Sequence, residues 1–121
     1  MDEEAAVERA TRNGASYAEA RVETVEEGRI SVEDGELRTL VAGSETGFGF
    51  RVLVDGAWGF ASSNDLSADA WRGAVDSAVR LARRSAGQGR AVRLADAPVE
   101  RTTEVWRPNQ DPRDVAVEEK L

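Results

Sequence analysis

The sequence predicts an α+β fold: a four-stranded antiparallel β-meander over about residues 17–62, with helices at about 3–13 and 67–85 packed on it. Two Asp-Gly pairs, at 34–35 and 55–56, lie between apolar runs. Such pairs favour two-residue hairpin turns, because both turn residues need positive φ. Apolar and polar residues alternate before the first turn, whereas residues 67–85 follow the period of a helix. These patterns predict a sheet followed by a covering helix.

The composition narrows the functional classes. The chain has 121 residues, enough for one domain with a modest core. Its formal net charge of −7 disfavours binding to nucleic acid. The absence of Cys and His excludes a disulfide framework, thiolate chemistry and the usual general base. No apolar run would span a bilayer and the acidic start is unlike a secretory signal, so we expect a cytoplasmic protein without membrane contacts.

The first helix is predicted over residues 3–13. Acidic side chains occupy its first turn, where the helix dipole favours them, and Ala6, Val7 and Ala10 form a narrow apolar stripe. Asn13 and Gly14 provide the stop, since both residue types tolerate a left-handed cap.

A long half-buried strand is expected from Tyr17 onward. Its even positions are mostly apolar and its odd positions mostly polar up to Glu33, as in a strand with one solvated face. A polar patch at Thr24, Glu26 and Gly28 interrupts the alternation and predicts a bulge or a bend.

Two turns would bound the second strand. The turn at 34–35 places Val32 opposite Leu37, so the apolar face continues into a returning strand at 37–42. A third turn is expected at Gly43-Ser44-Glu45, where the chain would enter the next strand. This third turn is what makes the predicted meander four-stranded.

The central hairpin, residues 47–62, has a register set by its turn at 55–56. Val54 lies opposite Ala57, and Arg51 lies opposite Phe60. On both faces of this hairpin large side chains meet small ones. We therefore expect both faces to be at least partly covered.

The best helix of the sequence lies over residues 67–85, with Ser67 as its N-cap. After it, we expect a short strand at 91–94 and an edge strand near 99–106. Asp111 as N-cap, with Pro112 at the first helical position, predicts a C-terminal helix from about 112 that is truncated at the chain end. The apolar stripe expected on helix 67–85 consists of Trp71, Ala74, Val75, Ala78, Leu81 and Ala82.

Several segments resemble the TldD/PmbA family. They are residues 14–22, 30–37, 47–66, 111–115 and 118–121, and their occurrence in this order carries the resemblance. The third segment, Gly-Phe-Gly-Phe-Arg-Val-Leu-Val-Asp-Gly-Ala-Trp-Gly-Phe-Ala-Ser-Ser-Asn-Asp-Leu, is its strongest part. Members of this family, once labelled modulators of DNA gyrase, are regarded as zinc-dependent peptidases.

The resemblance implies a single N-terminal α+β domain over residues 1–110. Residues 111–121 would begin a helix or linker to a C-terminal catalytic domain outside this chain. The family's zinc motif, His-Glu-x-x-x-His, has no match here, so the resemblance implies no catalytic, cofactor-binding or metal-binding residue in this chain and assigns zinc to the full-length protein. The implied partners are a second subunit of the same family, in a homo- or heterodimer, and a peptide or unfolded protein substrate. Whether the parent subunit is catalytic stays open, since the family includes partners without the motif.

Arg51, Trp58 and Phe60 share one face of the central hairpin in the predicted register. One interpretation is a contact surface for a peptide or a second subunit, with Arg51 over the Phe60 ring as a cation–π pair. The other is that both aromatic residues are core beneath a helix.

Four further groups of residues have a functional and a structural interpretation. Gly47-x-Gly49 matches no phosphate-loop spacing, and no helix follows it, which favours close strand packing. The turn Ser62-Ser63-Asn64-Asp65 is either a ligand-binding corner or a turn that caps the next helix. Glu23, Glu26 and Glu27 form either a cation site or a solvated strand face. Arg80, Arg83 and Arg84 form either an anion-binding patch or the cationic end that a helix C-terminus favours.

Two classes of function therefore remain. The first is a non-catalytic N-terminal domain of a TldD/PmbA-like metallopeptidase, which helps dimer assembly and encloses an unfolded peptide for a zinc site elsewhere. The second is a free-standing interaction module that binds a partner by β-strand addition. A coding sequence continuing into a His-Glu-x-x-x-His region would favour the first.

Overall fold

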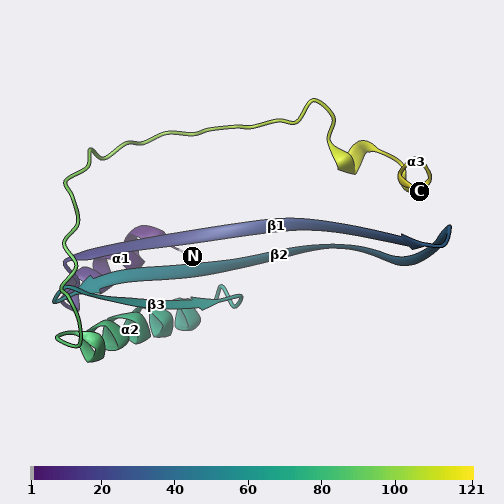
Figure 1. The fold of residues 1–121 in the computed structure, drawn as a ribbon. Helices are drawn as coiled ribbons and strands as arrows, with labels where there is room; N and C mark the ends of the chain where they lie inside the picture. The colour runs from purple at the N-terminus through teal and green to yellow at the C-terminus, as the bar shows by residue number, and fades with distance from the viewer. Residues whose placement is uncertain (1) are drawn as a thin grey trace. The chain divides into compact units, whose positions relative to one another are not determined.

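A computed structural model describes residues 2–121 and confirms the α+β class. Helices precede and follow a single antiparallel sheet, as Figure 1 shows. In chain order the elements are α1 (Glu3–Arg12), β1 (Tyr17–Glu33), β2 (Glu36–Val54), β3 (Ala57–Ser63), α2 (Ala68–Ser85), the 3-10 helix η1 (Pro112–Asp114) and α3 (Val117–Lys120).

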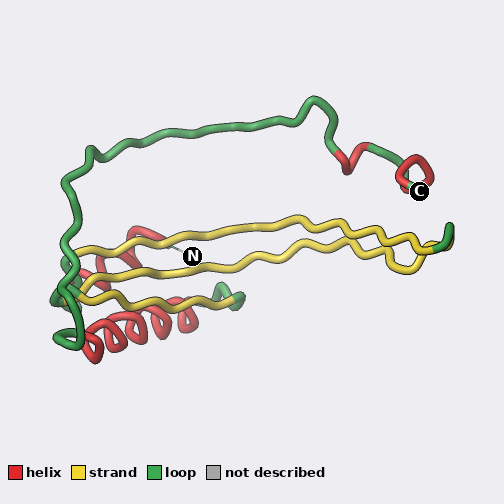
Figure 2. The backbone as a smooth tube through the Cα atoms, in the orientation of Figure 1, coloured by secondary structure: helices red, strands yellow, loops and turns green. Residues whose placement is uncertain are grey.

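The sheet has three strands in the order β1-β2-β3, so the prediction of four strands is wrong. The expected turn at Gly43-Ser44-Glu45 lies inside β2, which Figure 2 draws as one uninterrupted strand. In a tight turn Gly43 would use the positive φ that glycine can adopt, but its φ is negative. The hydroxyls of Thr24 and Thr46 lie 2.9 Å apart, which keeps β1 beside β2 through this stretch.

The β2–β3 hairpin has the predicted register at every position. Arg51 lies opposite Phe60 and Val54 lies opposite Ala57. Asp55 has φ 49° and Gly56 has φ 78°, the positive values that a two-residue primed turn requires.

The register that the turn at 34–35 sets does not continue unbroken to the Thr24–Thr46 contact. The two-residue turn at 34–35 places odd residues of one strand opposite even residues of the other. Nearer the helices, Thr24 meets Thr46 and Glu19 meets Arg51, so residues of equal parity share a face there. The register of β1 against β2 therefore shifts between the turn and Thr24, and the bulge or bend expected at Thr24, Glu26 and Gly28 stays a prediction.

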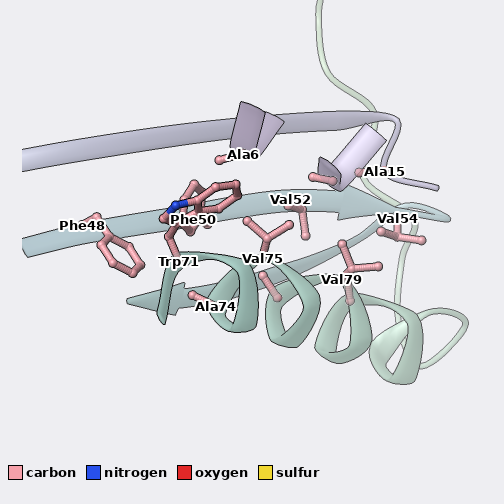
Figure 3. Packing of buried hydrophobic residues seen from close by; sticks show 13 residues of the cluster. Ala6, Ala15, Phe48, Phe50, Val52, Val54, Trp71, Ala74, Val75 and Val79 are labelled. Atoms are coloured by element: carbon pink, nitrogen blue, oxygen red, sulfur yellow. The ribbon is translucent and has the colours of Figure 1, made fainter. Parts of the chain in front are cut away.

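Helices α1 and α2 pack on one face of the sheet, and their contact surfaces consist mostly of alanine (Figure 3). The N-caps are Asp2 for α1 and, as predicted, Ser67 for α2. Gly59 lets α2 approach β3 closely, because a Cβ there would lie 1.9 Å from the carbonyl oxygen of Ala78. The residues buried between helices and sheet are Ala6, Ala10, Ala15, Phe48, Phe50, Val52, Val54, Trp71, Ala74, Val75, Ala78, Val79 and Ala82.

The opposite face of the central hairpin is largely open, so the prediction that both faces are covered holds only in part. Leu53 is buried on this face and Trp58 is half-buried, but the Phe60 side chain is 59% exposed. Large–small pairing across a hairpin therefore fixes its packing within the sheet without showing what covers it.

The described chain divides into two compact units. The first contains the residues up to Val25 together with Ser44–Leu94, and the second contains Glu26–Gly43 and Ala95–Leu121. Every buried residue belongs to the first unit. The domain boundary expected at residue 110 stays a prediction.

The strands predicted at 91–94 and 99–106 are absent. Both segments lack regular secondary structure in the described chain. The first makes a single backbone bond to the sheet turn, from the Val92 N–H to the Gly56 carbonyl. In the second, Val99 is 94% and Trp106 is 84% exposed. Alternation of apolar residues produces a strand only where a sheet edge accepts it.

The C-terminal helix starts at the predicted residues but is not continuous. The Asp111 carboxylate accepts from the Arg113 N–H and caps η1, whose first residue is Pro112. The helical turn then stops, and α3 adds only Val117–Lys120. Within the second unit, the Arg113 side chain bonds both Asp111 and Glu26. Among residues 2–121 no helix is long and apolar enough to cross a membrane.

Candidate functional site

The sheet face opposite the helices carries the predicted contact residues; we call it the open face. Arg51 projects from β2, and Trp58 and Phe60 project from β3, all on this face. The interpretation of both aromatic residues as core beneath a helix is therefore wrong. A contact role for the three residues stays a prediction.

The cation–π pair on this face differs from the one expected. The Arg51 guanidinium lies 4.8 Å from the centroid of the Trp58 ring, not over Phe60. The Tyr17 ring meets Trp58 edge-on at 5.9 Å, and this geometry suits the ring quadrupoles. Trp58 is thus held from two sides, which leaves Phe60 as the most exposed aromatic side chain of the open face.

Glu19 joins Tyr17 and Arg51 in one network. The Tyr17 hydroxyl donates to Glu19 Oε2 at 2.7 Å, and Arg51 Nε lies 3.0 Å from Glu19 Oε1. The Tyr17 hydrogen bond, then the Arg51 guanidinium, lowers the pKa of Glu19, while that same hydrogen bond raises the pKa of Tyr17. The sequence pattern placed Glu19 on the polar face of its strand. In the sheet, this polar face of β1 lies on the same side as the Arg51 side chain of β2.

A shallow groove runs beside this network on the open face and has a volume of about 1010 Å³. Its floor contains Gly47 and Gly49, which carry no side chain of their own. The Phe60 ring lies over Gly49, since a Cβ there would lie 3.3 Å from the ring. The Gly-x-Gly pair thus serves close packing and a flat floor, not a phosphate loop. The groove walls include Glu19, Arg21, Glu23, Val25, Glu45, Thr46, Arg51, Phe60, Ser62, Ser63 and Asn64.

The turn at 62–65 is a helix-capping turn. Ser63 Oγ accepts from the Asp65 N–H, and Asp65 Oδ1 accepts from the Ser67 N–H. The hydrogen bonds that Asp65 accepts from Ser67 lower the pKa of Asp65. The Ser67 hydroxyl in turn accepts from the Ala70 N–H at the start of α2. Ser62, Ser63 and Asn64 nevertheless line one end of the groove.

The residues of this chain do not fit a metal site. Among residues 2–121 no group of three or more Asp and Glu side chains converges, and the sequence has neither His nor Cys. In the proposed acidic cluster, Glu26 pairs with Arg113 and Glu27 pairs with Arg29, while Glu23 lines the groove. Charged strand residues satisfied by arginine explain the cluster without a cation.

Comparison with known proteins decides the family. Residues 18–82, more than half of the chain, match the family model described as PmbA/TldA metallopeptidase domain 1. This chain belongs to the PmbA/TldD metallopeptidase family. The match begins in β1 and ends in α2, so it includes most of the open face and the part of the core that the sheet and α2 form.

Two archaeal relatives of this PmbA/TldD chain are named as metalloproteases. Metalloprotease MJ0996 of Methanocaldococcus jannaschii is 30% identical over 67 residues, which are 55% of this chain and 15% of the relative. A metalloprotease of Methanothermobacter thermautotrophicus is 39% identical over 51 residues, which are 42% of this chain and 11% of the relative. The chain thus spans well under a quarter of either relative. The metal that the family name implies has no residues to hold it in the described part of this domain.

Proposed function

We propose that this chain is the non-catalytic first domain of a cytoplasmic PmbA/TldD-type metallopeptidase. Its open face would contact an unfolded peptide substrate, while the zinc chemistry takes place outside these residues. The observation that carries the proposal is the groove beside Phe60, which combines an exposed aromatic wall with a floor of glycine backbone. A concave surface that offers an exposed aromatic ring among charged and polar side chains suits binding of a peptide.

The chemistry of the groove suits an extended peptide of mixed sequence. Phe60 offers exposed apolar area, and Ser62, Ser63 and Asn64 at one end of the groove offer hydrogen-bonding groups. The walls carry both signs of charge, with Arg21 and Arg51 among several glutamates. Such a surface selects for an unfolded chain more than for one side chain. The same face, or a sheet edge, would serve dimer assembly with a second subunit of the family.

Peptide binding to the 121-residue chain tests this proposal. The fluorescence anisotropy of a labelled, unstructured peptide rich in apolar residues would be measured against the chain and its Phe60→Ser variant. Loss of a buried Phe contact is worth about 2 kcal/mol, so we expect affinity to fall roughly tenfold or more. The control is Leu81→Ser, because Leu81 is also an exposed apolar residue but lies on α2. Equal affinities for the chain and the Phe60 variant would contradict a role for the open face.

Metal analysis and an activity assay test the non-catalytic part. The purified chain should hold no stoichiometric zinc and should leave the bound peptide intact. Tight zinc or peptide cleavage would overturn the assignment to a non-catalytic domain.

The second candidate function, strand addition by a free-standing module, rests on the sheet edges. β1 and β3 are the edge strands of the described sheet, and each presents one row of backbone groups outward. A peptide with alternate main-chain N-methyl groups discriminates the two modes. It should lose affinity for a sheet edge but keep its side-chain contacts with the groove. The coding sequence beyond Leu121 provides the independent check, since a His-Glu-x-x-x-His region would favour the metallopeptidase domain.

A further inference from the structure

A second hollow lies between α1 and α2, on the helix side of the sheet. It has a volume of about 540 Å³, and we call it the arginine hollow. Four of its seven lining residues are arginines, in a chain whose net charge is −7. It is lined by Arg9, Asn13, Asp76, Val79, Arg80, Arg83 and Arg84.

The one acidic residue of the arginine hollow is already neutralised. Asp76 accepts from Arg9 Nε at 2.8 Å and from Arg9 Nη2 at 2.7 Å, a bidentate pair. The Asn13 amide donates to the same carboxylate at 3.1 Å. These bonds, led by those from Arg9, lower the pKa of Asp76. The remaining charge of the hollow is therefore that of Arg80, Arg83 and Arg84.

None of these three arginines forms a direct ion pair within residues 2–121, although the charge of Arg80 also acts on Asp76. Arg83 is positioned by the end of α1, where its Nη2 donates to the Asn13 carbonyl. Arg80 Nη2 donates to Ser77 Oγ at 2.8 Å. The arrangement holds guanidinium groups around a concave space while leaving most of their donors unused.

A helix C-terminus favours cations, but this explains only part of the cluster. It accounts for Arg83 and Arg84, which occupy the last turn of α2. It does not account for Arg80, which lies before that turn, or for the convergence of four arginines on a hollow with a single carboxylate. Like charges held together repel each other, and an anion bound between them would remove that repulsion.

We propose that the arginine hollow binds a small ligand with a multiply charged phosphate group. Guanidinium groups recognise phosphate oxygens through paired, charge-assisted hydrogen bonds, and the rigid fork of Arg suits this better than Lys does. The net charge of three matches a diphosphate better than a single carboxylate. A volume of about 540 Å³ is in the range of small-molecule sites. The hollow lies on the opposite side of the sheet from the open face, so this site is separate from the one proposed for peptide.

Pyrophosphate binding tests the proposal directly. Sodium pyrophosphate would be titrated into the 121-residue chain at constant ionic strength, with heat and the side-chain NMR signals of arginine as readouts. We expect saturable binding that shifts signals of Arg80 and Arg84. The double variant Arg80→Gln/Arg84→Gln should weaken binding about tenfold or more, as expected for lost charge-assisted bonds. Arg83 is left in place because it caps α1.

A matched double variant separates a site from general charge attraction. Arg72→Gln/Arg90→Gln removes the same charge outside the arginine hollow and should change affinity by less than about twofold. Equal loss in both double variants, or no saturable binding by the wild-type chain, would overturn the proposal. Citrate binding as tight as pyrophosphate would overturn the phosphate class. Binding to vesicles of phosphatidylglycerol without binding to pyrophosphate would overturn a soluble ligand in favour of a lipid headgroup.

Discussion

At the scale of single residues, Gly59 decides how closely the sheet and its helix pack. A Cβ at this position would lie 1.9 Å from the Ala78 carbonyl oxygen and 2.8 Å from the Ala82 nitrogen. Both are backbone atoms of α2, so no side-chain movement would relieve the clash. The alanines along α2 and the glycine on β3 together allow the two elements to pack closely.

Gly59→Ala should therefore destabilise the chain more than other Gly→Ala changes. Because α2 would have to move off β3, we expect the free energy of unfolding to fall by about 2 kcal/mol or more. Urea denaturation would measure the loss. The matched control is Gly73→Ala, on the exposed side of α2 with nothing within 4 Å, which should raise stability by roughly 0.5–1 kcal/mol. Similar effects for both variants would contradict the close approach.

Asp76 provides a pH-dependent link between the two helices. Its pKa is lowered from the ordinary value of 3.8, mainly by the hydrogen bonds from Arg9. A lowered folded-state pKa means that the carboxylate stabilises the fold at pH values above 3.8, and that this contribution is lost as the pH falls through the folded-state pKa. Asp76→Asn should thus cost about 1 kcal/mol at neutral pH, since both partners are partly solvated. Thermal melts of both forms from neutral pH downward should converge below pH 3.8; a constant difference would contradict this role.

The apolar stripe on α2 shows that helical spacing does not determine which residues at the edges of the stripe are buried. Helical spacing predicts burial of Trp71, Val75 and Ala78, and all three are buried. Leu81 belongs to the predicted stripe but is 48% exposed, and Val79 is buried in its place. At about 100° per residue these two lie roughly 80° on either side of the stripe, so helical spacing alone does not choose between them. The position of α1 determines that Val79 is buried and Leu81 is not, because Val79 lines the hollow between α1 and α2.

At the scale of elements, turn chemistry is the most reliable signal. Asp34, Gly35, Asp55 and Gly56 all have positive φ, as the two-residue hairpin turns require. Gly43 fails as a turn signal, because it has no Asp or Asn beside it and a glycine also fits an extended strand. The register of β1 against β2 changes between the turn at 34–35 and the Thr24–Thr46 contact, and in the register found near the helices Glu19 meets Arg51.

Gly43→Val tests whether this residue is strand or turn. The position has negative φ, and a Cβ added there would meet nothing within 4 Å, so a β-branched side chain fits. We expect the variant to fold with unchanged or slightly raised strand content, since Val has the higher β propensity by up to about 1 kcal/mol. Backbone amide exchange around residues 43–46 would measure the pairing. Faster exchange there than in the parent chain would favour the turn that the sequence suggests.

At the scale of the whole molecule, the sequence reveals the fold class and the family but not which faces are covered. The contrast between large and small side chains looks the same whether a helix, a second subunit or solvent lies above the hairpin. The residues after Leu94 pose the opposite problem. Val99, Val105 and Trp106 alternate like an edge strand, yet all three are exposed and unpaired in the described chain. Alternating apolar residues show that a segment is able to pair as a β-strand. Whether it does pair depends on the other elements of the folded molecule.

Because the buried residues all belong to the first unit, residues 95–121 should contribute little to its stability. A chain that ends at Leu94 should keep a cooperative thermal transition, with a midpoint within about 4 °C of the 121-residue chain, because it loses no fully buried residue. Val75→Ala serves as the sensitivity control, since it removes buried methyl groups and should cost roughly 1–2 kcal/mol. Circular dichroism melts of the three chains make the comparison. Loss of the transition in the shortened chain would mean that the C-terminal segment completes the core. Retention would show that the chain up to Leu94 folds without residues 95–121, and that the aromatic and apolar side chains after Leu94 have a role other than stabilising it.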